Sequence, residues 1–166
     1  MRDIRFRAKR LDDGKWIVGG GVIRCTLPPR GKNPLSEFEK KLPFTQEQVW
    51  MFHLDEKNHP TITMVIGDTV GQSTGQYCLP VKGELWEGDI VSIVAEDGRE
   101  SHFVIRYGIA QRTMDTGWKV DIPCFYFDLV GGNFKAFPIV KNYLGKHDLE
   151  MMDKIGNIHD NPELLK

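Results

Sequence analysis

Short strand-like segments joined by tight turns constrain the fold of this chain more than any other feature. Ile4, Phe6 and Ala8 alternate with charged residues, which is the period of two expected of a half-buried strand. The Asp-Gly pairs at 13–14 and 97–98 favour the positive φ angles of hairpin turns. Segments of this kind recur along the chain, so the sequence predicts a mainly β protein.

Other segments extend this pattern. Strands are expected at residues 16–18, 61–66, 90–94, 103–107, 118–130 and 134–140. Gly19-Gly20-Gly21 predicts a bulge or a close approach of two backbones, and Pro123 places the middle of its strand at an edge or a bulge. Glu87-Gly88-Asp89 predicts a tight turn in which Gly88 has positive φ and Asp89 accepts a backbone N–H. The alternative, a pair of acid/base carboxylates, requires a cleft and a partner residue.

Three segments are interpreted as helical or irregular. Residues 49–54 could form a helix or a strand, and helix or irregular structure is favoured. Apolar residues three apart predict a helix over 148–154. Gly156 is expected to end that helix in a left-handed conformation. Asn161 and Pro162 then predict the N-cap and first residue of a short closing helical turn. The expected fold class is mainly β, a β-rich α+β arrangement with a short C-terminal helix.

Composition divides the chain into two regions. The stretch from Thr26 to Pro43 is rich in Pro, Lys and Arg and predicts a long, basic, mobile loop. We therefore expect one region at residues 1–69, with the N-terminal hairpin and this loop, and a second at residues 70–166. A chain of 166 residues also suits a single compact unit.

Charge is unevenly distributed although the net charge is only −1. Residues 1–45 carry eleven Lys/Arg and five Asp/Glu, a net +6, whereas residues 46–166 carry eleven and eighteen, a net −7. Such polarity steers one end toward an acidic partner or toward the opposite end of another copy, unless both surfaces are simply solvated. A uniformly basic binder of the DNA backbone is not indicated.

Composition also favours a cytoplasmic protein. Three cysteines at long spacings are typical of reduced core thiols. No run approaches the about 18 apolar residues of a membrane span. Residues 1–7 lack the apolar stretch of a secretory signal. We expect no membrane partner.

Several short patterns suggest catalysis without supplying a complete set of groups. Asp115-Thr116-Gly117 matches the aspartic-protease tripeptide, but a second copy is absent, so it is interpreted as a hairpin turn. Residues 71–75 lack the Lys of a phosphate-binding loop and are interpreted as an ordinary loop. We expect no catalytic residue, metal or cofactor. A metal-dependent hydrolase using His53, Asp55 and His59 is the alternative.

Three segments together resemble the YopX-like family of phage and prophage proteins. They are Arg2–Ala8, Leu85–Val91 and Ile155–Leu165, at the beginning, middle and end of the chain. The resemblance implies a mainly β protein with an SH3-like, partly open barrel after the central motif. It also implies assembly into oligomers and a location in the bacterial host cell, with no established catalytic activity. The chain departs from the family pattern between Thr26 and Gln76, and again at residues 77–83.

These observations lead to two functional hypotheses. The first is a non-catalytic, self-associating protein-interaction module that contacts further copies and unidentified phage or host proteins. The alternative is a nucleic-acid-binding accessory protein that uses the basic N-terminal strand and loop. Its candidate residues are Arg2, Arg5, Arg7, Lys9, Arg10, Arg30 and Lys32. The candidate structural motif comprises Glu87, Gly88, Asp89, Gly156, Asn157, Asn161 and Pro162.

Overall fold

The structure, a computed structural model, describes residues 4–26, 47–78, 83–95, 97–113, 116–136 and 151–166. The chain divides into two compact units, one that ends at Val70 and one that begins at Gly71. Antiparallel strands dominate both units, so the expected mainly β class is confirmed. The predicted loop at 26–43 falls almost entirely outside the described residues.

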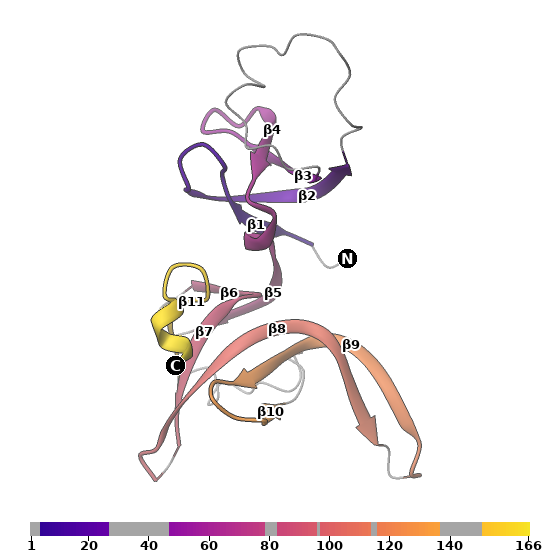
Figure 1. Cartoon of the computed structure of the whole chain (residues 1–166), viewed down its shortest axis with the longest axis vertical. Coiled ribbons are helices and arrows are strands. Elements are labelled where there is room, and N and C mark those ends of the chain that lie inside the picture. The colour runs from indigo at the N-terminus through magenta and orange to yellow at the C-terminus, as the bar shows by residue number, and fades with distance from the viewer. Residues whose placement is uncertain (1–3, 27–46, 79–82, 96, 114–115, 137–150) are drawn as a thin grey trace. The chain divides into compact units, whose positions relative to one another are not determined.

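The N-terminal unit is an antiparallel sheet followed by one short 3₁₀ turn. Its elements are β1 (Phe6–Lys9), β2 (Trp16–Thr26), β3 (Glu47–Leu54), β4 (Pro60–Val65) and η1 (Gly67–Thr69), and the strands lie in the order β4-β3-β2-β1 (Figure 1). The sheet curls at one end, because Ile66 N donates to Lys9 O at 2.8 Å and Leu11 N donates to Met64 O at 3.1 Å.

The glycine run in β2 has the predicted effect. The register of β2 against β3 shifts between Gly19 and Gly21, which places a bulge at Gly20. Gly19 also lies so close to the Phe52 carbonyl that a Cβ atom would overlap it. Glycine is therefore required here by the approach of two backbones.

The helical interpretation of residues 49–54 is wrong, because they form most of β3. Val49 and Met51 point into the core of the N-terminal unit, while Phe52 is exposed. A short run that is apolar on both faces has no period of two, and such a run is indistinguishable from a buried helix by pattern alone. The buried core of this unit comprises Ala8, Val49, Met51 and Val65.

The C-terminal unit contains a hairpin and a five-stranded antiparallel sheet. The hairpin pairs β5 (Gly71–Cys78) with β6 (Gly83–Trp86). The sheet has the order β10-β9-β8-β7-β11, formed by β7 (Asp89–Val94), β8 (Glu100–Thr113), β9 (Lys119–Leu129), β10 (Lys135–Ala136) and β11 (Met152–Asn157), and a 3₁₀ turn, η2 (Pro162–Leu165), follows. A cluster of seven residues is buried in this unit: Leu85, Val91, Phe103, Ile105, Phe125, Phe127 and Met152.

Two local predictions fail in the C-terminal unit. Residues 71–75 are not a loop but the start of β5, whose register shifts between Ser73 and Tyr77 and so accommodates the positive φ of Gly75. Of the helix predicted at 148–154, residues 148–150 lie outside the described residues, and residues 152–154 are not helical but begin β11, which pairs with β7. The apolar pattern that predicted this helix covered a short segment. The edge of β7 supplied backbone hydrogen-bond partners, which such a pattern does not reveal.

Turn chemistry was predicted well. Gly14, Gly98 and Gly117 have φ angles of 69°, 81° and 83° at the turns between successive paired strands. Pro123 lies at an edge, as expected, because β10 pairs with β9 only at Phe127 and Asp128. The described strands form no closed barrel. Among the described residues, no helix has the length and apolarity needed to cross a membrane.

Candidate functional site

The two most distinctive motifs of the sequence lie side by side in the C-terminal unit. β11 pairs antiparallel with β7, which places Asn157 opposite Asp89 and Gly156 opposite Ile90. Figure 1 shows β11 and the closing helical turn beside β7. We call the residues 87–89 and 154–161 the motif junction. Sequence analysis found both halves but gave no signal that they meet.

The central turn of the motif junction is held on both sides. Gly88 has φ 84°, as predicted. Its N–H donates to Ile105 O at 2.8 Å, and its carbonyl accepts Ile158 N–H at 2.9 Å. A Cβ on Gly88 would meet the Ile158 side chain at 3.5 Å, so the closing segment packs directly on the turn. Glu87 contributes its backbone, which donates to Gln72 O at 2.9 Å.

A buried ion pair joins the two halves of the junction. The Asp89 carboxylate is fully buried and accepts Trp86 N–H at 2.9 Å, the backbone bond that the sequence predicted. Lys154 Nζ lies 2.9 Å from the same carboxylate oxygen, and its side chain is 24% exposed. A buried carboxylate requires such a partner because desolvation of an unpaired charge is costly. Sequence reasoning did not find Lys154.

The closing loop is organised by Asn157. Its Oδ1 accepts His159 N–H at 2.9 Å and Asp160 N–H at 3.0 Å, while its Nδ2 donates to Asp160 Oδ2 at 2.6 Å. Asn157 also accepts Asn161 N–H through its main-chain carbonyl at 2.9 Å. Asn157 thus fixes three consecutive residues in a turn, His159 and Asp160 through its side chain and Asn161 through its main chain.

Gly156 has a different role from the one predicted. It lies in β11 and is not among the residues with positive φ, so it does not end a helix. A Cβ at this position would be 2.5 Å from Asn161 Oδ1, so glycine is required because the Asn161 side chain lies close to the strand. Asn161 and Pro162 do occupy the N-cap and first position of η2, but the Asn161 side chain makes no capping hydrogen bond. It donates instead to Glu163 Oε1 at 3.3 Å.

Comparison with known protein families assigns most of the chain to one family. The family model described as YopX protein matches residues 36–166, which include both halves of the motif junction. The chain belongs to the YopX family. The matched range excludes β1 and most of β2, so the assignment rests on the remaining strands. Searches of curated proteins and of solved structures returned no match.

The basic residues proposed for nucleic-acid binding precede the YopX-matched range, and the four of them that the structure describes have local contacts. Arg7 is 8% exposed, and its guanidinium carbon lies 4.6 Å from the centre of the Trp16 ring. Lys9 Nζ lies 5.5 Å from the same ring. Arg5 is half-buried just before β1. The remaining candidates Arg2, Arg30 and Lys32 lie outside the described residues.

Arg10 is held by acidic neighbours. Its Nη2 donates to Asp12 Oδ2, and its Nε lies 3.6 Å from Asp13 Oδ1. This hydrogen bond to the Asp12 carboxylate raises the pKa of Arg10, and the same bond lowers the pKa of Asp12. The charge of Arg10 is thus largely compensated within its own turn.

The histidines considered for metal binding are used in local hydrogen bonds. His53 Nε2 lies 2.7 Å from Thr63 Oγ1 and its Nδ1 lies 3.0 Å from Leu54 O. Asp55 accepts His59 N–H at 2.8 Å and shapes the turn before β4. Within the part of the chain that is described, no three His, Cys, Asp or Glu side chains are grouped as metal ligands. The tripeptide at 115–117 is described only from Thr116 onward.

The N-terminal unit presents an apolar surface that the sequence analysis missed. Residues directly opposite each other in antiparallel strands share a face. Trp50 lies opposite Ile23 and Met64, and Phe52 lies opposite Ile62. We define the outer apolar face as Ile23, Trp50, Phe52, Leu54, Ile62 and Met64. Four of these side chains are 43–57% exposed, namely Ile23, Phe52, Leu54 and Ile62. The sequence did contain a signal for this face, because Trp50, Phe52 and Leu54 are apolar as well as the alternating Val49 and Met51.

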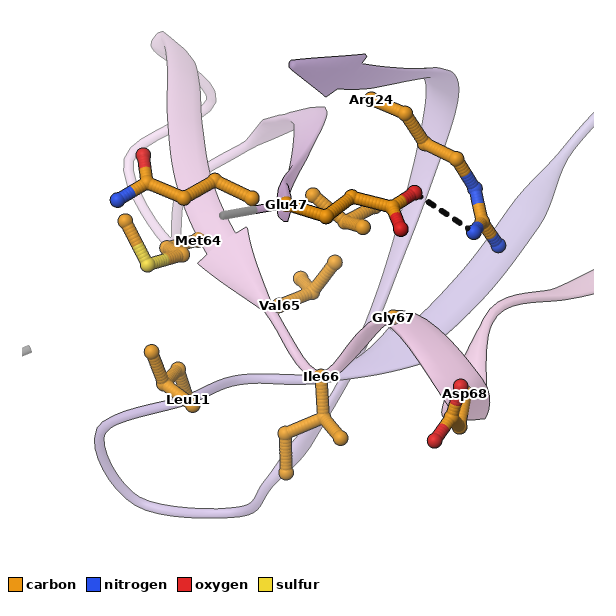
Figure 2. Close-up of a pocket in the computed structure, with 10 residues that line it drawn as sticks. Leu11, Arg24, Glu47, Met64, Val65, Ile66, Gly67 and Asp68 are labelled. Atoms are coloured by element: carbon orange, nitrogen blue, oxygen red, sulfur yellow. Dashed lines mark hydrogen bonds and ion pairs between the residues drawn. The ribbon is translucent and has the colours of Figure 1, made fainter. Parts of the chain in front are cut away.

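A groove borders this sheet at its curled end. It has a volume of about 350 Å³ and an apolar lining that includes Leu11, Met64 and Ile66. An exposed ion pair between Arg24 and Glu47, 3.1 Å apart, lies at its border. Figure 2 shows this pair above Val65 and Gly67, with Leu11 and Ile66 on the opposite side of the groove. Its partly open, apolar character suits contact with an apolar side chain of another molecule better than catalysis.

The C-terminal unit also exposes single apolar side chains on an extension of two of its strands. β8 continues past its pairing with β7, which ends at Val104, and β9 continues past β10. Residues 108–113 and 119–124 therefore form a two-stranded extension, which we call the β8–β9 arm. Figure 1 shows the two long curved strands that end in it. Ile109 is 71% exposed, and Trp118, beside its terminal turn, is 76% exposed.

Proposed function

We propose that this YopX-family chain is a non-catalytic protein-interaction module that associates with further copies of itself. The observation that supports this proposal is the outer apolar face of the N-terminal unit. A small sheet normally buries one apolar face and exposes a polar one. Here the inner face buries Val49 and Met51, while the outer face exposes Phe52 and Ile62.

Continuous exposed apolar surface is typical of protein–protein interaction sites. Cross-strand neighbours make the outer apolar face continuous across β2, β3 and β4, because Ile23, Trp50 and Met64 form one row and Phe52 and Ile62 form the next. Aromatic residues such as Trp50 and Phe52 are enriched at such interfaces. The polar groups of the motif junction, in contrast, are engaged with one another and support a structural role.

Sedimentation velocity over a micromolar concentration series tests this function. We expect wild-type protein to sediment as an assembly that dissociates on dilution. Ile62→Ser, on the outer apolar face, is expected to shift the population toward monomer. Ile4→Ser is the matched control, because Ile4 is similarly exposed, 53% against 49% for Ile62, but lies outside that face. A wild-type chain that stays monomeric throughout the series contradicts the proposal.

The alternative function is nucleic-acid binding through the basic first strand. Arg7 and Lys9 both lie over the Trp16 ring, and a combination of cations and an aromatic ring is typical of single-stranded nucleic-acid binding surfaces. Asp12 and Asp13 compensate the positive charge of Arg10, which weakens this hypothesis. Titration with a labelled oligonucleotide at two salt concentrations decides it, since phosphate contacts weaken steeply with salt. Absence of binding at low salt excludes this function.

Three finer expectations are also proposals. We infer an origin in a phage or prophage and a location in the host cytoplasm from the family resemblance. The SH3-like, partly open barrel in residues 70–166 is supported by the antiparallel order of β7, β8 and β9 and by their curvature (Figure 1). The genes that flank the gene of this protein test the phage or prophage origin, because phage genes cluster by role. An experimental structure tests the last.

A further inference from the structure

The outer apolar face lies on a side of the sheet that carries no charge over β2, β3 and β4. Alternating residues of a strand share one side of a sheet, and opposed residues of paired strands share the same side. After the bulge in β2, the described residues on this side are Gly21, Ile23, Cys25, Gln48, Trp50, Phe52, Leu54, Pro60, Ile62 and Met64. None of them is Asp, Glu, Lys, Arg or His. A partner therefore finds no charged group here with which to form an ion pair.

This composition is characteristic of contacts between identical chains. Interfaces between exchangeable partners are about as polar as ordinary protein surface. Homodimer interfaces are more apolar and resemble a domain core cut in two. The outer apolar face has this core-like character, because Phe52 and Ile62 are directly opposed and are 45% and 49% exposed.

Contact between two identical faces imposes a condition on charge, which this side of the sheet meets. The two copies of such a contact are related by a twofold axis, so a residue near the axis meets its own counterpart. A charge there would meet the same charge at short range, which is destabilising. Phe52 lies on β3, the middle strand of the face, between Gly21 and Ile62. Neither Phe52 nor its neighbours in this row bring such repulsion.

The available area suits a contact of this kind. A large apolar side chain presents about 200 Å² when fully exposed, so the four that are about half exposed present on the order of 400 Å². Pro60, which is exposed, and the partly exposed Trp50 and Met64 add to this area. Two copies of the face together thus bury about the 1,000 Å² that a specific interface needs.

The β8–β9 arm does not offer an equivalent surface. Ile109 lies opposite Pro123, and Val120 lies opposite Arg112. This register places Ile109 and Val120 on opposite sides of the arm, so the arm does not present them as one face.

We propose that the outer apolar faces of two copies pack on each other about a twofold axis and form a closed dimer. This inference rests on the proposed self-association and specifies which surface of the second copy is the partner. Face-to-face packing of two sheets is the arrangement of a β-sandwich. The contact covers the face of both copies, so it stops at two chains.

Opposite charges introduced at one position test this geometry. Phe52→Lys and Phe52→Glu each place a charge in the middle of the face. Val94→Lys and Val94→Glu are the matched controls, because Val94 is 44% exposed, against 45% for Phe52, but lies in the C-terminal unit. Sedimentation velocity at low salt is measured for each variant alone and for the equimolar mixture of each pair.

We expect the wild-type protein and the Val94 variants to be dimers, and each Phe52 variant alone to be monomeric. The mixture of Phe52→Lys with Phe52→Glu is expected to form a dimer with one copy of each, because the two charges then attract. Only a contact in which the same region of both copies meets is rescued in this way. Circular dichroism of each variant checks the fold, and Ile62→Lys with Ile62→Glu replaces the pair if either Phe52 variant is unfolded.

Three results overturn the inference while leaving self-association intact. A mixture of folded, oppositely charged variants that stays monomeric excludes contact between the two faces. A charged variant that still dimerises alone places the contact elsewhere on the chain. A wild-type assembly larger than a dimer contradicts the closed dimer. A monomeric wild-type protein overturns the proposed function as well, and assigns the face to a different protein.

Discussion

Both units of this chain are built from antiparallel strands, but they differ in what they bury and in what they expose. The N-terminal sheet is apolar on both faces, and Phe52 and Ile62 remain about half exposed. The C-terminal unit instead buries a charge, Asp89, and neutralises it with Lys154 from its own last strand. The C-terminal unit therefore pairs its buried carboxylate with a cation from the same chain. The N-terminal unit leaves apolar side chains exposed on its outer face.

The difference extends to the size of the buried cores. Four residues form the buried cluster of the N-terminal unit, and seven form that of the C-terminal unit. Aromatic contacts strengthen the larger cluster, where the rings of Phe103 and Phe127 meet edge to face with centres 6.0 Å apart. A small core gains stability when association covers more apolar surface. The following three changes test this contrast.

The largest effect is expected from Lys154→Met. Removing the ammonium leaves the buried Asp89 carboxylate without its cation, which typically costs about 3–5 kcal/mol in the free energy of unfolding. Urea unfolding measures the loss, and amide hydrogen exchange is expected to place it in β7 and β11 and not in β1–β4. Lys135→Met is the control, because Lys135 is exposed and only approaches the Tyr126 ring at 5.1 Å.

Addition of Asp89→Asn to Lys154→Met provides a second check. It removes the buried negative charge that Lys154 balanced and is expected to recover part of the lost stability. Equal destabilisation by Lys154→Met and Lys135→Met would show that the buried pair contributes nothing specific to the C-terminal unit.

An intermediate effect is expected from Gly156→Ala. The added Cβ would lie 2.5 Å from Asn161 Oδ1, so the closing loop must shift, at about 1–3 kcal/mol in the free energy of unfolding. Gly20→Ala in the N-terminal unit is the matched control, because nothing lies within 4 Å of a Cβ there. Thermal unfolding of both variants measures the difference. If Gly20→Ala lowered the midpoint as much as Gly156→Ala, close packing of the closing loop would not be the cause.

The smallest effect concerns the pH dependence of the C-terminal sheet. A hydrogen bond from Ser92 Oγ to Glu100 Oε1, 2.6 Å long, and a second contact with His102 lower the pKa of Glu100. A lowered pKa in the folded state means that this contribution to stability is present above the unfolded pKa. It is lost as the pH falls through the folded pKa. Ser92→Ala is expected to raise the pKa of Glu100 toward its ordinary value.

Side-chain NMR titration of Glu100 measures this shift. Ser101→Ala, at the neighbouring position, is the control and is expected to leave the titration unchanged. An unchanged pKa in Ser92→Ala would assign the shift to His102 alone.

Local chemistry explains which parts of the fold were predictable. Turn glycines such as Gly14, Gly88 and Gly98 were predicted because positive φ is a property of the residue itself. The bulge at Gly20 and the edge position of Pro123 follow from equally local restrictions. Asp89 likewise accepts the backbone bond expected of it, whereas Gly156 and the Asn161 side chain have other roles than the predicted ones.

The failures share a physical cause. Residues 49–54 and 152–154 became strands because strand edges distant in sequence supplied their hydrogen bonds. The Gly156 requirement arises from Asn161 Oδ1, which reaches the strand only after the closing loop folds back. Periodicity within a short window contains no information on these partners.

The sequence by itself determined the strand-rich class, the positions of the tight turns and membership in the YopX family. Only the tertiary structure brought Lys154 to Asp89, and only the pairing of β2, β3 and β4 assembled the outer apolar face. Turn propensities act between adjacent residues, whereas burial and exposure depend on which distant strands become neighbours. The surfaces that carry the proposed interaction belong to the second kind.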